Sequence, residues 1–256
     1  LHGPEELFQG CNHHLEAAKL PLAEATRLLL NRCTGLLLAR ELLLQGELSA
    51  EDSDFIGRNL AKAQLALGDA LLSAFGQYHW SCRERHRRLV GLAPSLSEAP
   101  LACLRQQLLE HHSAGVDFKL HPRKLRQSRE ELEPVHRELS GLAAQLWLWL
   151  ESRRLNCRFA SVQDYCASGL NKCPEAPRWR NRLLNLRSFG LKGALGSLGG
   201  RYPRERLFNS LPLLLWESEG PGEPGTVRQL QSRLESRAAA WAGLVAAYKA
   251  IWPAYA

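Results

Sequence analysis

The stretch that decides the fold of this chain is SAEDSDFIGRNLAKAQLALGDALLSAFG, residues 49–76 of 256. Apolar side chains recur along it three or four positions apart, which is the spacing of one helix face. These side chains are Ile56, Leu60, Ala63, Leu67, Ala70 and Ala74. Ser49 and Asp52 form a capping-box pattern at its start, and Gly76 marks its end. The segment therefore predicts one long amphipathic helix.

The residues before this segment predict a partner helix from about Pro21 to Gln45. Apolar residues again follow one face, and Gly46 is placed to cap the end. Only a short turn separates the two helices, so we expect an antiparallel helix hairpin.

The rest of the chain shows the same helical patterning. Leucine and alanine dominate, and β-branched residues never form an alternating run. Further helices are predicted at about 79–90, 98–112, 128–155, 161 onward, 177–189, 203–216 and 226–251, with a short lead-in at Pro4, a glycine-rich loop at 190–200 and a linker at 219–225. The predicted fold is all-α, an irregular bundle of about eight to nine helices built from antiparallel hairpins.

An irregular, basic segment at 115–127 interrupts this pattern. It suggests a boundary between a helical bundle of residues 1–114 and a second bundle of residues 115–256. The alternative is one continuous domain.

Composition limits the classes of function. The net charge of +7 permits contact with a nucleotide or nucleic acid but is modest for this length. The seven cysteines are an odd number and contain no C-x-x-C pair, which is typical of free thiols in a reducing cytoplasm. The apolar runs are too often interrupted by charge to cross a bilayer, so we expect a soluble cytoplasmic protein with no membrane partner.

No complete catalytic motif is present. G-x-S-x-G and P-loop patterns are missing, and neither Cys11 with His13 and His14 nor Cys157 with Cys166 and Cys173 has zinc spacing, so no metal is expected. An Arg followed by a His, as in HEPN-type ribonucleases, occurs twice, but chance accounts for both pairs more readily. The pairs are Arg105 with His111 and Arg129 with His136.

Two basic clusters are candidate binding sites. One contains Arg83 and Arg85, for which a solvated helix face is the simpler interpretation. The other runs from Arg178 to Arg206, and its aromatic residues could stack on bases while its arginines contact phosphates. Its binding candidates are Arg178, Arg182 and Arg187.

A family resemblance adds to this interpretation. The stretches RLLLNR (27–32), RNLAKA (58–63), LGDALL (67–72), GQY (76–78) and RER (83–85) resemble the helical region that follows the catalytic domain in prokaryotic nucleotidyltransferase-domain proteins. The resemblance is specific over residues 20–89.

The resemblance implies that Lys62 and Asp69 either stabilise these accessory helices or face the catalytic cleft. Members of that superfamily carry an N-terminal α/β domain, with a Gly-Ser signature and paired aspartates that hold magnesium. Neither Gly196-Ser197 nor Asp52-Ser53-Asp54 fits that signature. The implied partner is therefore a catalytic domain outside this chain, which lacks methionine and begins at Leu1. Magnesium and a nucleotide are expected only with that domain, and no cofactor is expected in this chain.

Three hypotheses follow. The first is a non-catalytic accessory module of a nucleotidyltransferase-like protein that shapes substrate binding or partner contacts. The second is a basic helical protein that binds nucleic acid. The third is a HEPN-type ribonuclease. Gly68 adds a structural expectation. A glycine inside a helix costs about 1 kcal/mol relative to alanine, so we expect something to approach its backbone closely. The conservative candidate is a neighbouring helix, and the functional alternative is that Asp69 and Lys62 face the missing domain or its nucleotide.

Overall fold

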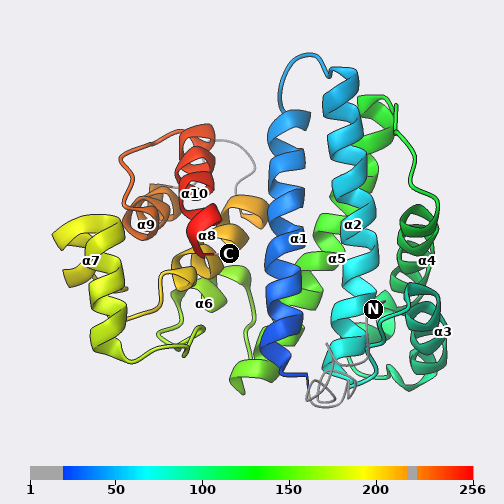
Figure 1. The fold of residues 1–256 in the computed structure, drawn as a ribbon, viewed down its shortest axis with the longest axis horizontal. Coiled ribbons are helices and arrows are strands. Elements are labelled where there is room, and N and C mark those ends of the chain that lie inside the picture. Colours follow the sequence, from blue (N-terminus) through cyan, green and yellow to red (C-terminus); the bar gives the residue numbers. More distant parts are fainter. Residues whose placement is uncertain (1–19, 218–223, 256) are drawn as a thin grey trace, which may run out of the picture.

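A computed structural model describes residues 20–217 and 224–255, and this part of the chain is helical without any strand (Figure 1). The all-α prediction is confirmed. The α-helices are α1 (Leu22–Leu43), α2 (Ala50–Ala74), α3 (Cys82–Leu92), α4 (Leu101–Leu120), α5 (Arg129–Leu155), α6 (Val162–Ala167), α7 (Arg178–Leu195), α8 (Arg204–Trp216), α9 (Pro224–Leu234) and α10 (Trp241–Tyr255), and η4 (Ala93–Ser95) is a 3-10 turn.

The larger half of the molecule contains α1 to α5, and the predicted hairpin of α1 and α2 lies at its centre. The capping box at the start of α2 is confirmed: Ser49 Oγ accepts a hydrogen bond from Asp52 N at 3.0 Å, and Asp52 Oδ2 accepts one from Ser49 N at 3.1 Å. These bonds satisfy backbone donors that the first helical turn otherwise leaves free. Helix α5 crosses both helices on one side, and α3 and α4 pack against α2 on the other.

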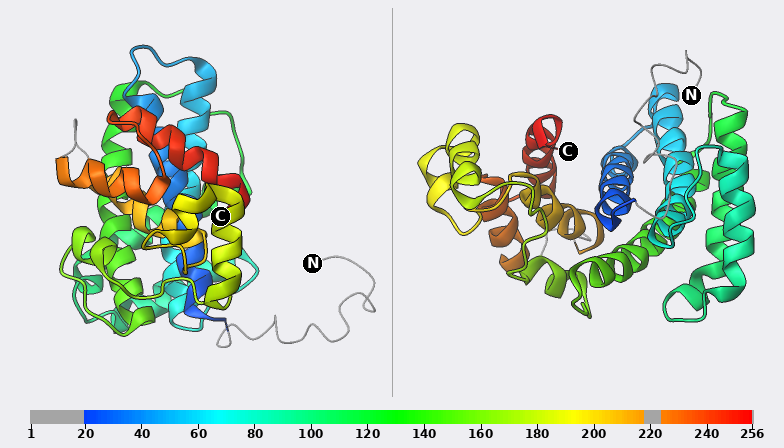
Figure 2. Two further views of the ribbon diagram at one scale, coloured as in Figure 1. Left: turned by 90° about the vertical axis from the view of Figure 1, so that its left-hand side faces the viewer. Right: turned by 60° about the horizontal axis from the view of Figure 1, so that its bottom comes forward.

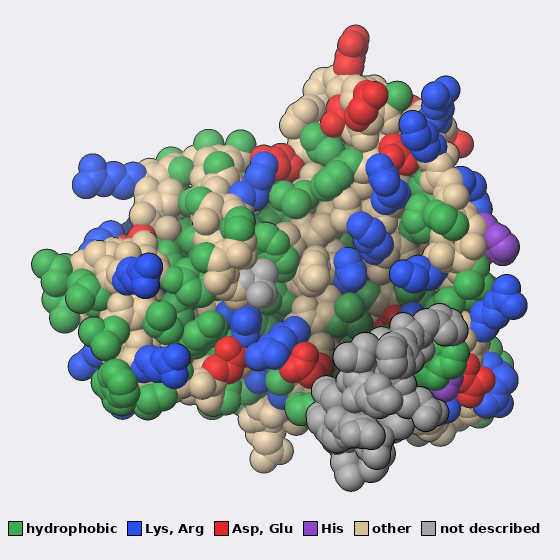
Figure 3. Space-filling model, viewed as in Figure 1, with side chains coloured by type: hydrophobic (Ala, Val, Ile, Leu, Met, Phe, Trp, Pro, Cys, Tyr) green, Lys and Arg blue, Asp and Glu red, His purple; other side chains and the backbone are tan. Residues whose placement is uncertain are grey.

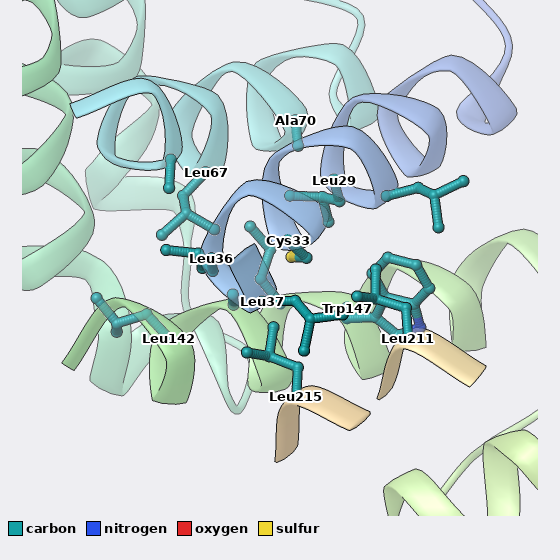
Figure 4. Packing of buried hydrophobic residues seen from close by; sticks show 14 of the residues in the cluster. Leu29, Cys33, Leu36, Leu37, Leu67, Ala70, Leu142, Trp147, Leu211 and Leu215 are labelled. Atoms are coloured by element: carbon teal, nitrogen blue, oxygen red, sulfur yellow. The ribbon is translucent and has the colours of Figure 1, made fainter. Parts of the chain in front are cut away.

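The core lies where α1, α2, α5 and α8 meet (Figure 4). Leu36 and Leu37 of α1, Trp147 of α5 and Leu211 of α8 are fully buried there. A charged group also lies inside: the Glu151 carboxylate accepts hydrogen bonds from Thr26 Oγ1 at 2.8 Å, Tyr165 Oη at 2.9 Å and the Arg154 guanidinium at 2.6 and 2.7 Å. Its partners come from three helices, so this network fixes how α1, α5 and α6 are arranged.

The smaller half contains α6 to α10, with α8 in contact with α1, α6, α9 and α10. Together the two halves form a crescent (Figure 2). Helix α7 lies at the outer edge of the smaller half, away from the α1–α2 hairpin.

Three predicted boundaries differ from the structure. Helix α4 continues to Leu120, so the predicted division after residue 114 falls within a helix. The helix expected at 226–251 is two helices, α9 and α10, because residue Glu235 adopts a left-handed conformation (φ 49°). The chain bends at Gly190 (φ 67°) but returns to helix as far as Leu195, so the glycine-rich loop is shorter than expected.

None of the described helices is long and apolar enough to cross a bilayer. The lead-in expected at Pro4 and the group of Cys11, His13 and His14 lie outside the described residues.

Candidate functional site

A pocket of about 350 Å³ opens between α1, α2 and the end of α4. Its charged lining is Arg32 from α1, Lys62 and Asp69 from α2, and Lys119 from α4. Leu28, Leu65, Phe118 and Pro122 supply apolar walls. The two residues that the resemblance singled out on α2, Lys62 and Asp69, therefore line the same pocket.

Helix periodicity and close packing build this pocket. Lys62 and Asp69 are seven residues apart, which places them on one face of α2 two turns apart. Helix α4 reaches that face because residue 115 is glycine, and a Cβ there would lie 2.5 Å from the backbone nitrogen of Leu65. A side chain at residue 115 would push α4 away and open the pocket.

Asp69 is buried at the inner end of the pocket. Its Oδ1 lies 2.8 Å from Arg85 Nε and 3.1 Å from His112 Nε2. The first contact is an ion pair without hydrogen-bond alignment, since Arg85 Nε makes no hydrogen bond within the described chain. Arg85 Nη1 instead donates to Tyr78 Oη at 2.9 Å. The charge of Asp69 is thus balanced by the buried Arg85, and Arg32, Lys62 and Lys119, which also line the pocket, do not pair with it.

A second histidine extends this network toward the surface. His86 Nδ1 lies 3.2 Å from His112 Nδ1, and burial together with the neighbouring His112 lowers the pKa of His86. The His112 ring therefore lies between the Asp69 carboxylate and the His86 ring. A Cβ at Gly68 would lie 2.4 Å from His112 Cδ2, which confirms that a neighbouring helix packs against this glycine.

The three cations of the pocket have no acidic partner among the residues that the structure describes. Arg32, Lys62 and Lys119 form no ion pair with any other described residue. In contrast, Glu84 pairs with both Arg87 and Arg88 on α3, and those hydrogen bonds lower the pKa of Glu84 to about 2. Figure 3 shows Lys and Arg side chains gathered over α2 and toward α1. Within the described part of the chain, the pocket therefore combines apolar walls with three cations that no ion pair neutralises, which suits an anionic ligand.

The Arg83–Arg85 cluster divides between two environments. Arg83 is exposed, whereas Arg85 is buried against Asp69. The expectation of a solvated face therefore fails for Arg85, because its guanidinium compensates a buried carboxylate.

The arginines of α7 lie far from this pocket. Arg178, Arg182 and Arg187 are exposed, so they remain available to a partner. Arg206, which the sequence placed in the same cluster, is buried and bonded to Asn185 Oδ1 and to the backbone oxygens of Gly193 and Arg233.

Three of the four residues in the Arg–His pairs make contacts between helices. Arg129 donates to the Leu43, Gln45 and Gly46 oxygens at the end of α1, and His136 Nε2 lies 2.9 Å from Leu36 O. His111 contacts Gln64 and Glu138, while Arg105 faces solvent on the same helix. Cys157, Cys166 and Cys173 belong to no group of three or more possible metal ligands among the described residues.

A larger hollow of about 820 Å³ lies between the two halves, beside Trp216 and Trp241. The cation of Arg40 lies 5.3 Å from the Trp241 ring centre and binds the Leu215 oxygen at 2.9 Å. Because Arg40 and His136, which line this hollow, already have partners within the protein, it is the weaker candidate.

Arg32, Lys119 and His112 were not among the predicted site residues. Arg32 ends the RLLLNR stretch, and Lys119 lies in the basic segment that was expected to be irregular. The glycine at residue 68 indicated that a residue from elsewhere packs closely against α2, but the sequence did not identify that residue as His112. No family model, curated protein or solved structure matches this chain.

Proposed function

We propose that this chain is a helical accessory module that acts beside a nucleotidyltransferase catalytic domain and binds the phosphate groups of a nucleotide or substrate in the α1–α2–α4 pocket. The observation that carries the proposal is the convergence of Arg32, Lys62 and Lys119, from three helices, on one pocket where no other described residue forms an ion pair with them. The catalytic domain is taken from the resemblance of residues 20–89.

The chemistry of the pocket fits a phosphorylated ligand with an apolar or aromatic part. Lysine and arginine side chains donate charge-assisted hydrogen bonds to phosphate oxygens. Phe118 and Leu28 offer surface for a base or another flat group. The module itself supplies binding and orientation, and the transfer reaction belongs to the catalytic domain.

Calorimetric titration of the chain with ATP and with inorganic phosphate at low salt tests the binding. Lys62→Gln is expected to weaken ATP binding about tenfold, because one charge-assisted contact contributes about 1.5–3 kcal/mol. Arg83→Gln removes the same charge from an exposed site outside the pocket and is the matched control. Equal losses in the two variants, or no ATP binding by the unaltered chain, would contradict the pocket.

The proposed catalytic partner has its own test. A Gly-Ser signature followed by an Asp-x-Asp pair is expected in the same reading frame or in an adjacent gene. A genomic neighbourhood without either motif would count against the accessory role and leave the pocket result unaffected.

A further inference from the structure

Helix α7 is folded with its polar side inward. Asn181 and Asn185 are its buried anchors, at 1% and 0% exposure. Asn185 Nδ2 donates to the oxygens of Asn181 at 2.9 Å, Gly199 at 3.2 Å and Arg201 at 2.8 Å. Asn181 Nδ2 donates to the oxygens of Ala176 at 3.0 Å and Gly200 at 3.2 Å. Hydrogen bonds to the following loop therefore hold much of the inner side of this helix.

The outer side of α7 is apolar. Trp179, Leu183 and Leu186 are 66%, 57% and 41% exposed, and their spacing of four and three residues places them on one stripe. Beyond the bend at Gly190, Leu191 and Leu195 are also exposed, at 71% and 82%. We call these five side chains the α7 stripe. It is the largest local concentration of exposed hydrophobic residues in the described chain.

Positive charge borders the three stripe residues before the bend on both sides. At 100° per residue, Arg178 and Arg182 lie on one side of Trp179, Leu183 and Leu186, while Arg180 and Arg187 lie on the other. The sequence of α7 contains no acidic residue. Figure 3 shows hydrophobic side chains interspersed with Lys and Arg at the end of the molecule formed by α7.

A cationic hollow continues from the end of α7. Lys192, between Leu191 and Leu195, lines a space of about 370 Å³ with Arg228, Gln231, Ser232, Ser236 and Arg237. Glu235 lies 3.4 Å from Lys192 Nζ but also pairs with Arg206 at 3.2 Å. Cations, hydroxyls and an amide together are suitable donors for a phosphate group.

We infer that the α7 stripe docks onto the surface of an anionic lipid bilayer, with a lipid phosphate received in the hollow at Lys192. Tryptophan and leucine on one face of a helix, with arginines at both margins, are the features of a helix lying in a membrane interface. The arginines would remain at headgroup level while their stems and the leucines enter the acyl boundary. The helix lies on the bilayer and does not cross it.

Charge and polarity argue against the other occupants. A second copy of α7 would place arginines against arginines with no carboxylate on either helix. A nucleic acid would pair with the arginines and stack on Trp179, but it would leave the four leucines without an apolar partner.

Vesicle co-sedimentation of the whole chain tests the inference, with neutral phosphatidylcholine vesicles compared to vesicles that contain anionic phosphatidylglycerol. Binding at least tenfold tighter to the anionic vesicles is expected, and salt should weaken it. The double substitution Leu183→Ser with Leu186→Ser should reduce binding at least tenfold. Leu44→Ser, at an exposed leucine outside α7, should leave it unchanged. Circular dichroism checks that each variant keeps its helix content.

Two further measurements distinguish a lipid phosphate from a free phosphate, and a lipid bilayer from a nucleic acid. Soluble glycerophosphate should compete weakly, because it cannot engage the stripe. No preference for anionic vesicles, or equal vesicle binding by the double variant, would overturn the inference. The inference would also be overturned if the chain bound an oligonucleotide more tightly than anionic vesicles and the leucine substitutions left that oligonucleotide binding unchanged.

Discussion

Helices α2 and α7 are both amphipathic, but α2 turns its apolar face toward the protein interior and α7 turns its apolar face outward. Helix α2 buries Ile56, Leu60 and Leu67 and exposes Lys62, as a helix of a water-soluble bundle does. Helix α7 buries two asparagines and exposes a tryptophan and four leucines. Hydrophobic burial holds α2 in place, whereas side-chain amides bonded to backbone oxygens are prominent in holding α7. The same kind of pattern therefore builds a core in one region and leaves an apolar surface for a partner in the other.

The largest expected effect concerns the buried charge of α2. Asp69→Ala should lower the free energy of unfolding by about 3–5 kcal/mol, because Arg85 would be left buried without its carboxylate. Urea denaturation followed by circular dichroism measures this change. Asp69→Leu combined with Arg85→Met removes both charges and should recover most of the lost stability. If Asp69→Ala lowered the free energy of unfolding by less than about 1 kcal/mol, the Asp69–Arg85 ion pair would not be a major source of stability at the α1–α2–α4 pocket.

Because α7 buries polar residues and exposes apolar ones, we expect smaller effects on stability there, with the larger loss at a polar residue and the smaller one at a leucine. Asn185→Leu should cost about 1–3 kcal/mol, because the oxygens of Gly199 and Arg201 lose a buried donor. Leu183→Ser, on the exposed stripe, should change stability by no more than about 0.5 kcal/mol. The same denaturation experiment compares them. If Leu183→Ser were the more damaging substitution, the stripe would belong to the core and the contrast with α2 would fail.

The smallest expected effect is a difference in acid sensitivity. Burial lowers the pKa of His136, and burial with His112 lowers that of His86. Their folded pKa values lie below the usual value of about 6.5, so their neutral forms add stability above that pH. This contribution is lost as the pH falls through the folded pKa. The chain has no histidine after residue 136, and burial raises the pKa of Glu205 in α8, which has the opposite sign.

Hydrogen exchange measured helix by helix between pH 7 and pH 5.5 should therefore show earlier loss of protection in α3 and α5 than in α8. His136→Gln keeps a donor for Leu36 O but does not titrate, so it should reduce the acid response of α5. Uniform acid weakening of all helices would contradict the assignment to these histidines.

Much of the larger half could be predicted from its pattern. The hairpin of α1 and α2, the Ser49–Asp52 capping box and the close neighbour of Gly68 follow from local rules of spacing, capping and backbone freedom. The placement of Lys62 and Asp69 on one face also follows from their separation of seven residues. The identity of their neighbours does not, because Arg32, His112 and Lys119 reach the pocket only through helix packing.

The sequence by itself determined that the chain is helical, where most helices begin, and which face of α2 is apolar. Only the tertiary structure decided that Arg85 turns inward while Arg83 faces solvent, and that α7 presents its leucines outward. The physical reason is that periodicity separates a polar from an apolar face but does not say which face meets the protein. That choice depends on partners distant in sequence, such as Asp69 for Arg85 and the Gly199–Arg201 oxygens for Asn185.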